Sequence, residues 1–135
     1  MSISLNYLRR KNFAIYGLGV TGNSVIEYFQ KNGFKNFVVW DDDTEVFKKT
    51  VGPKYKSKRD NFLQLVNFAD YIVLSPGIKI EEAKLKKILL KNKSKIITDL
   101  DLFYLLNPDI KSIVVTGTNG KSTTCKIIEH VLKKN

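Results

Sequence analysis

The chain has 135 residues, of which 43% are hydrophobic and 27% charged, and its formal net charge is +10. This length allows one compact domain with a real core and is too short for two ordinary ones, so any second fold must be incomplete. No apolar run approaches the roughly 20 residues that a membrane helix needs, and the N-terminal segment has no cleavage signature. We therefore expect a cytoplasmic protein with no membrane partner.

The positive charge comes mainly from two lysine-rich stretches, at residues 48–59 and 84–95. Basic proteins often bind nucleic acids or acidic small molecules. The second stretch has the spacing of a solvated helix face, and lysine is frequent throughout the chain, so we expect no nucleic-acid partner. The only cysteine, Cys125, excludes an intramolecular disulfide, and its helical apolar position predicts a core residue.

Short apolar runs rich in β-branched residues alternate with helical patterns. In chain order, we predict a strand at 12–17, a helix at 21–33, a strand at 36–41, a basic loop and then a short helix around 62–68. There follow a strand at 71–77, a helix at 81–92, a strand at 95–99, a short helix at 101–107, a strand at 112–117 and a closing helix at 121–134. This alternation predicts an α/β fold with a doubly wound, Rossmann-like parallel sheet.

The predicted helix at 101–107 is followed by Pro108, and the residue before a proline disfavours the helical region. The segment 105–111 is therefore the best candidate for a linker. We expect one domain at 1–107 and the start of a second, incomplete domain at 108–135.

The first candidate ligand loop is "GLGVTG", which lies between the first predicted strand and the first predicted helix. Gly17 permits a tight turn, Gly19 lets a ligand approach the backbone, and Gly22 lets the helix pack closely on the strand. Free N–H groups at the start of the helix attract an anion. The loop by itself indicates NAD, FAD or another nucleotide, and a purely structural use of the glycines stays open.

Two further strand ends carry polar or turn-forming residues. Asp41 ends the second strand, where a carboxylate can accept hydrogen bonds from a ribose or another polar ligand group. Ser75, Pro76 and Gly77 follow the third strand. The carboxyl ends of parallel strands meet at the edge where ligands bind in open α/β sheets, although an ordinary turn would also use these residues.

The second candidate loop is "GTNGKST", at 117–123, between a predicted strand and a predicted helix. Its spacing departs from the usual GxxxxGK[ST] of a P-loop, because Val115 stands where the first glycine is expected. Gly117 and Gly120 still let backbone N–H groups curl around phosphates, Lys121 offers a positive charge, and Ser122 can ligate a magnesium ion. We expect this loop to bind the phosphates of ATP.

The motifs "GTNGKST", "GLGVTG", "LSPGI" and "TDLDLF" together resemble those of the Mur ligases, in particular the members that add D-glutamate. These ATP-dependent amide ligases build the peptide of peptidoglycan precursors, a task linked to cell wall biogenesis, cell shape and cell division. The resemblance covers essentially the whole chain but only the opening part of enzymes that usually have three domains. It implies a UDP-substrate-binding domain at 1–107, followed at 108–135 by the first strand, P-loop and helix of a truncated ATPase domain.

The resemblance also implies roles for particular residues. The uridine and diphosphate of UDP-N-acetylmuramoyl-L-alanine would be held by Gly17, Gly19, Val20, Thr21, Gly22, Asp41, Ser75, Pro76 and Gly77. ATP would be bound by Gly117, Thr118, Asn119, Gly120, Lys121, Ser122 and Thr123, with Thr116 shaping the loop. Asp42 and Asp43 depart from the pattern of the family, and we expect them to face solvent or to hold the uridine end.

In such a ligase, ATP phosphorylates the substrate carboxylate, and the amine of D-glutamate attacks the resulting acyl phosphate, with release of ADP and phosphate. Lys121 and Ser122 would supply this chain's share of the catalytic apparatus, with Mg²⁺ held by Ser122 through ATP. The remaining magnesium ligands, the adenine contacts and the D-glutamate domain of the family would lie beyond Asn135. The chain is therefore expected to bind without ligating, and the full-length protein to be monomeric.

Three alternatives stay open at this point. The chain could be a standalone module that binds NAD or a UDP-sugar without chemistry, or a nucleic-acid-binding protein, or part of a ligase similar to folylpolyglutamate synthetases. His130 is expected to be a surface or packing residue of the closing helix. We also expect an apolar patch on that helix, formed by Ile127, Ile128, Val131 and Leu132, to favour self-association.

Overall fold

The computed structural model describes residues 4–134, so the first three residues and the last residue of the predicted domains lie outside the described residues. Four strands form its centre: β1 (Phe13–Tyr16), β2 (Phe37–Trp40), β3 (Tyr71–Leu74) and β4 (Ile96–Ile97). The α-helices are α1 (Leu5–Arg9), α2 (Val20–Lys31), α3 (Thr44–Val51), α4 (Tyr55–Leu65), α5 (Lys86–Lys91), α6 (Asp99–Leu106) and α7 (Lys121–Lys134). Short 3-10 turns lie at Gly52–Lys54, Val66–Phe68 and Lys93–Lys95.

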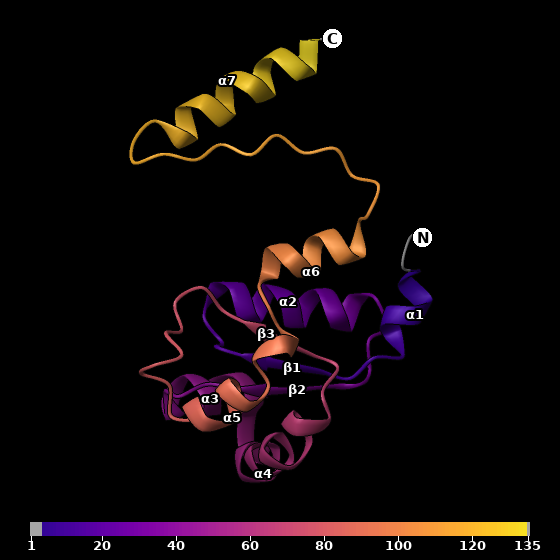
Figure 1. The fold of residues 1–135 in the computed structure, drawn as a ribbon, viewed down its shortest axis with the longest axis vertical. Helices are drawn as coiled ribbons and strands as arrows, with labels where there is room; N and C mark the ends of the chain where they lie inside the picture. Colours follow the sequence, from indigo (N-terminus) through magenta and orange to yellow (C-terminus); the bar gives the residue numbers. More distant parts are fainter. Residues whose placement is uncertain (1–3, 135) are drawn as a thin grey trace.

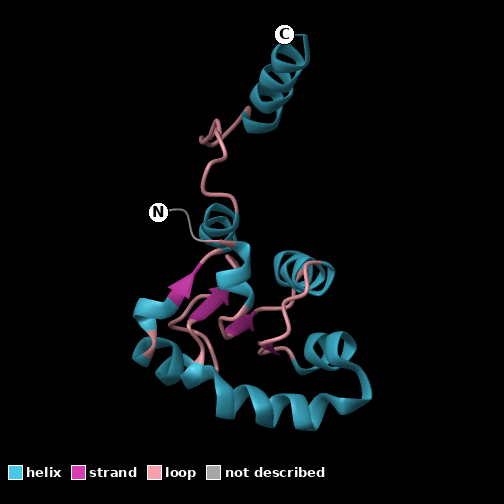
Figure 2. Cartoon of the chain, turned by 90° about the vertical axis from the view of Figure 1, so that its right-hand side faces the viewer, coloured by secondary structure: helices cyan, strands magenta, loops and turns pink. Residues whose placement is uncertain are grey.

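The four strands form one parallel sheet in the order β2-β1-β3-β4. The register sets Phe13 beside Phe37 on one side and beside Tyr71 on the other. Helices cover both faces of this sheet (Figure 2). The prediction of an α/β, doubly wound, Rossmann-like parallel sheet is confirmed, and the first four predicted strands all form.

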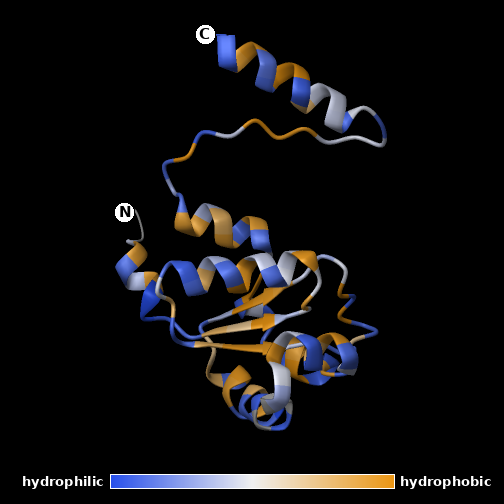
Figure 3. Cartoon of the chain, turned by 180° about the vertical axis from the view of Figure 1, so that it is seen from behind, coloured by the Kyte–Doolittle hydropathy of each residue, from blue (hydrophilic) through white to orange (hydrophobic). Residues whose placement is uncertain are grey.

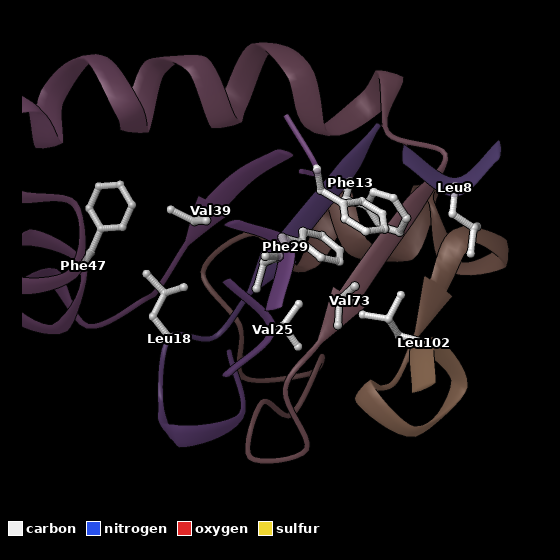
Figure 4. Close-up of a cluster of buried hydrophobic side chains, with 11 residues drawn as sticks. Leu8, Phe13, Leu18, Val25, Phe29, Val39, Phe47, Val73 and Leu102 are labelled. Atoms are coloured by element: carbon white, nitrogen blue, oxygen red, sulfur yellow. The ribbon is translucent and has the colours of Figure 1, made fainter. Parts of the chain in front are cut away.

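One face of the sheet packs against α1, α2 and α6. Alternate residues of a strand point to opposite faces, so Phe13 and Ile15 of β1 both point to this side. The Phe13 ring meets Phe29 of α2 edge-on, with a centroid distance of 4.9 Å. Leu102 of α6 belongs to the same cluster, which Figure 4 shows in close-up. The helix α6 is therefore packed with the sheet.

The opposite face packs against α4 and α5. Ala14 and Tyr16 of β1 point to this side and share a buried cluster with Phe62 of α4 and Leu89 of α5. The Tyr16 side chain is fully buried, and its ring lies 6.2 Å from that of Phe62. Two apolar layers thus fix the central strand, whose carboxyl end leads into the first glycine loop.

Several helices differ from the prediction. The basic segment expected to be a loop forms α3 and most of α4. The helix α3 begins at Thr44 because the Asp43 side chain caps it, accepting hydrogen bonds from the N–H groups of Glu45 and Val46. The helix predicted at 81–92 begins only at Lys86, since the Lys84 N–H donates its hydrogen bond to the carboxylate of Asp42 and not to a carbonyl oxygen of a preceding helical turn. The helix α1 was not predicted at all.

The strand predicted at 112–117 does not form within the described chain. Ile113 and Val114 are 64% and 78% exposed. Among residues 4–134, no strand lies beside the segment that joins α6 to α7, so this segment has no partner with which to pair (Figure 3). The helix α7 forms as predicted and lies apart from the sheet (Figure 1).

Cys125 is exposed, so the prediction of a core residue was wrong, whereas His130 lies at the surface as expected. Among residues 4–134, no helix has both the length and the apolar character to cross a membrane.

Candidate functional site

The candidate site lies at the carboxyl ends of β1 and β3. The chain goes from β1 outward to β2 and then returns to β3 on the other side of β1. The helix after β1 packs on one face of the sheet, and the first helix after β3 packs on the other. In open α/β sheets, ligands bind at such a switch point, outside the carboxyl ends of the strands.

The first glycine loop uses its three glycines in different ways. Gly17 has a φ of +98°, and a Cβ there would lie 2.7 Å from the Ser75 Cβ. A Cβ on Gly22 would lie 1.9 Å from the carbonyl oxygen of Gly17, so this position admits no side chain without a backbone shift. A Cβ on Gly19 would meet nothing within 4 Å. Two glycines therefore close the loop, and the third leaves open space for a ligand.

The same loop leads into an open helix N-terminus. Gly19 is the N-cap residue of α2 and supplies no side-chain cap, and the next residue, Val20, is 89% exposed. The Asn23 side-chain amide donates to the Leu18 carbonyl oxygen at 2.6 Å and holds the preceding turn in place. Since the first N–H groups of a helix have no partner within it, this end of α2 suits an anion.

Asp41 fixes the loop from the end of β2. One carboxylate oxygen accepts the Leu18 N–H at 2.6 Å, and the other accepts the Asp43 N–H at 2.7 Å. Each oxygen keeps further lone-pair capacity toward a ligand. Asp41 is half-buried, and its bond to the Leu18 N–H places it beside the glycine loop.

Ser75 joins the two sides of the switch point. Its hydroxyl donates to the Gly17 carbonyl oxygen at 2.8 Å, and its own N–H donates to the Tyr16 carbonyl oxygen at 2.9 Å. The following residues, Pro76 and Gly77, are exposed. The nine residues predicted to bind the UDP-substrate thus come together at one edge of the sheet, from three separate segments.

The structure corrects the expectation for Asp42 but not for Asp43, which is exposed as expected. Asp43 caps α3, and Asp42 is half-buried. The Asp42 carboxylate accepts hydrogen bonds from the Tyr16 hydroxyl at 2.6 Å, the Trp40 indole at 2.8 Å and the Lys84 N–H at 2.9 Å. The order Asp-Thr-Glu could have revealed the cap at Asp43. No local signal could have revealed the link to Lys84, because 42 residues separate the two.

Burial raises the pKa of the Tyr16 phenol, and its hydrogen bond to Asp42 raises it further. The phenol therefore stays protonated near neutral pH and can donate to the carboxylate.

The three successive aspartates do not form a metal site, since no group of three potential ligands that could hold a metal ion is found within residues 4–134.

Cavities adjoin the sheet on more than one side of the described chain. One of about 500 Å³ lies between α2 and α6 and includes Val20 and Thr21 of the glycine loop in its wall. Another, of about 660 Å³, is lined by Phe13, Phe37 and Phe68 together with residues of α2 and α4, and by none of the predicted site residues. Ligands in parallel sheets bind at the carboxyl ends of the strands, so the cavity between α2 and α6 is the one that belongs with the candidate site.

The second loop lies apart from this edge (Figure 1). Gly117 and Gly120 have φ angles of +142° and +78°, which curl the backbone before α7 begins at Lys121. The Lys121 ammonium donates to the carbonyl oxygens of Gly117 and Thr118. Apart from Ile128, the described residues from 116 onward are exposed, so the predicted ATP residues form a loop of their own and do not join the first site.

A family model and individual relatives both relate the chain to the same group of ligases. A family model described as Mur ligase MurD-like, N-terminal domain, matches residues 11–98. The chain is also similar to three proteins named UDP-N-acetylmuramoylalanine--D-glutamate ligase. It is 35% identical over 136 residues to that of Wolbachia pipientis wMel, which covers 97% of this chain and 26% of the relative.

The other two relatives match over the same part of the chain. The similarity to the Rickettsia prowazekii protein is 34% identity over 139 residues, with 97% of this chain and 29% of the relative covered. For Buchnera aphidicola subsp. Schizaphis graminum it is 33% over 137 residues, with 98% and 30% covered. The chain therefore spans between a quarter and a third of the length of these relatives.

Proposed function

The chain belongs to the MurD-like Mur ligase family, and from this premise we propose that its sheet domain binds the uridine diphosphate part of UDP-N-acetylmuramoyl-L-alanine. One observation carries the proposal. The glycine loop after β1 and the turn after β3 lie against each other at the switch point, joined by the bond from Ser75 to Gly17, while Gly19 and Val20 stay open.

The charges at this edge orient the proposed ligand. The diphosphate is negative and suits the start of α2, where backbone N–H groups and the helix dipole attract anions. Asp41 is an acceptor that suits the N–H and O–H donors of a base or a ribose and repels a phosphate. We therefore place the uridine toward the end of β2 and the diphosphate toward Gly19 and Thr21.

The loop at 117–123 is proposed to bind the phosphates of ATP with a magnesium ion. Its residues fit this group, because the two positive-φ glycines curl the backbone at the start of a 14-residue helix and because Lys121 and Ser122 are exposed there. When bound, ATP supplies the phosphoryl group that activates the substrate carboxylate. Lys121 would leave its carbonyl partners to bind the phosphates, and the Ser122 hydroxyl would orient the magnesium ion.

The whole ligase reaction is a further part of this proposal. D-glutamate would attack the activated carboxylate, in the cytoplasmic synthesis of peptidoglycan precursors. Ligation has to align three reactants closely. The 135 residues account for 26–30% of the length of the relatives, so we propose that by themselves they bind the UDP-substrate without completing the ligation.

A calorimetric titration tests the proposal. The folded protein is titrated with UDP-N-acetylmuramoyl-L-alanine and, separately, with NADH in the same buffer. Saturable binding of the UDP-substrate alone, weakened by Thr21→Ala, supports the proposal. Binding of NADH alone would overturn it in favour of a dinucleotide module, and binding of neither would overturn it for this chain.

A further inference from the structure

The carboxylate of Asp42 holds together three segments that are distant in sequence. Its Oδ1 accepts the Tyr16 hydroxyl from the end of β1 and the Trp40 indole from the end of β2. Its Oδ2 accepts the Lys84 N–H from the segment that follows β3. This carboxylate therefore does not point freely toward a ligand.

Two further hydrogen bonds join the same segments. The Lys84 ammonium donates to the main-chain carbonyl oxygen of Asp42 at 2.6 Å. The Leu85 N–H donates to the Tyr16 hydroxyl oxygen at 3.3 Å. Residues 84 and 85 are thus fastened to the ends of β1 and β2 by both main-chain and side-chain groups.

Lys84 and Leu85 lie at the end of the loop that follows β3. The beginning of the same loop contributes Ser75 to the candidate site. We call residues 75–85 the β3 loop. At its start, the Ser75 hydroxyl bonds to Gly17, and Ile78 lies so close that a Cβ on Gly17 would be 2.9 Å from its Cγ1. At its end, Lys84 and Leu85 bond to Asp42 and Tyr16. Both ends are therefore tied to the carboxyl edge of the sheet.

We propose that Asp42 is a positioning residue of the nucleotide site: by holding the end of the β3 loop, it fixes Pro76 and Gly77 opposite the glycine loop. This inference rests on the proposed function. Asp42 acts through the loop and does not contact the ligand. Small errors in the placement of binding groups weaken recognition strongly, so the fixed loop contributes to affinity.

Two pairs of variants test this role. Asp42→Asn keeps the Oδ1 acceptor for Tyr16 and Trp40 but replaces Oδ2 with an amide NH₂ that cannot accept the Lys84 N–H. Its matched control is Asp60→Asn, which changes an exposed carboxylate on α4. Lys84→Met removes the ammonium at the surface. Its control is Lys79→Met, on the same loop, where the ammonium pairs only locally with Glu82 at 3.0 Å.

The dissociation constant for UDP-N-acetylmuramoyl-L-alanine is measured by calorimetry on samples shown to be folded by near-UV circular dichroism. We expect Asp42→Asn to bind about tenfold more weakly and Lys84→Met more weakly than its control, while both controls match the wild type. Amide hydrogen exchange in residues 77–84 should be faster in Asp42→Asn.

The outcomes are distinguishable. A dissociation constant for Asp42→Asn equal to that of the wild type, even with lower stability, would show a purely structural role and overturn the inference. If Asp42→Asn does not fold, Lys84→Met decides, and equal binding by Lys84→Met and Lys79→Met overturns it. Absence of saturable binding by the wild type would overturn the proposed function and this inference with it.

Discussion

The Asp41 carboxylate accepts the Leu18 N–H at 2.6 Å, so the end of β2 holds the loop that follows β1. The other oxygen of the same carboxylate accepts the Asp43 N–H, which leads directly into the cap of α3. The residue proposed to face the uridine therefore also organises the backbone around it. Any change at Asp41 should affect both stability and binding.

Asp41→Ala should lower the free energy of unfolding by about 1–3 kcal/mol, because two backbone N–H groups lose a charged acceptor. Asp41→Asn keeps one acceptor oxygen and should lose less. Urea titration measures the stability, and calorimetry with the UDP-substrate measures the binding, which should weaken in both variants. The control is Asp60→Asn on α4. Wild-type stability in Asp41→Ala would contradict the structural role described above.

Alanine should affect stability at one glycine of the first loop and ligand binding at another. Gly22→Ala places a Cβ 1.9 Å from the Gly17 carbonyl oxygen, so the backbone must move, and we expect a loss of at least about 2 kcal/mol in stability. Gly19→Ala meets open space and should change stability by less than about 1 kcal/mol. Its methyl group would instead obstruct the approach of a diphosphate to the backbone.

Thermal or urea unfolding and calorimetry separate these two effects. Gly19→Ala should fold like the wild type and bind the UDP-substrate more weakly. If Gly19→Ala binds as tightly as the wild type, the ligand does not approach this part of the loop, and the placement of the diphosphate is wrong.

Asp70 should make stability depend on acid pH. The Asn12 N–H, which donates to this carboxylate at 2.8 Å, and then the Lys11 ammonium at 3.0 Å hold the pKa of Asp70 below its ordinary value of 3.8. A carboxylate whose pKa is lower in the folded state than in the unfolded state stabilises the protein above the unfolded value. This contribution is lost as the pH falls through the lower folded value.

Urea midpoints measured from about pH 7 down to about pH 3 test this dependence. The wild type should lose stability below about pH 4 more steeply than Asp70→Asn, which has no charge to lose there. The control is Asp60→Asn, which should keep the wild-type slope. Equal slopes in the wild type and Asp70→Asn would show that another group causes the acid loss.

The predictability of the fold depended on whether the determining contacts are local. The strand that begins at Phe13 and the helix that ends before Gly33 follow from apolar periodicity and a glycine stop, and both formed. The strand predicted at 112–117 has equally favourable residues but no neighbouring strand within residues 4–134, and it did not form. Strand propensity needs a partner, which a single segment does not specify.

In the candidate site, too, the features set by local sequence could be predicted and those set by distant contacts could not. The glycine loop could be located from sequence because its spacing is local, and Ser75 because it follows a recognisable strand. The bond that joins Ser75 to Gly17 spans 58 residues and depends on the strand order, which no sequence pattern revealed. The network around Asp42 escaped prediction for the same reason.

Lys121→Met should abolish binding of magnesium ATP by the second loop without changing stability. The ammonium is exposed and bonds only to carbonyl oxygens of its own loop, so its loss should change the free energy of unfolding by less than about 0.5 kcal/mol. Calorimetry with magnesium ATP measures the binding, and Lys126→Met, an exposed lysine further along α7, is the control. Equal affinity for magnesium ATP in both variants would show that Lys121 does not bind the phosphates.

The apolar side of α7 should cause association at high protein concentration. Ile127 and Leu132 are 60% and 63% exposed on this helix, and exposed apolar patches favour contact with another surface. We expect the apparent mass of the wild type in light scattering to rise with concentration, and the double variant Ile127→Ser/Leu132→Ser to stay monomeric. Lys126→Ser, a polar change on the same helix, should associate like the wild type. A wild-type protein that stays monomeric over the whole concentration range would show that α7 does not promote association.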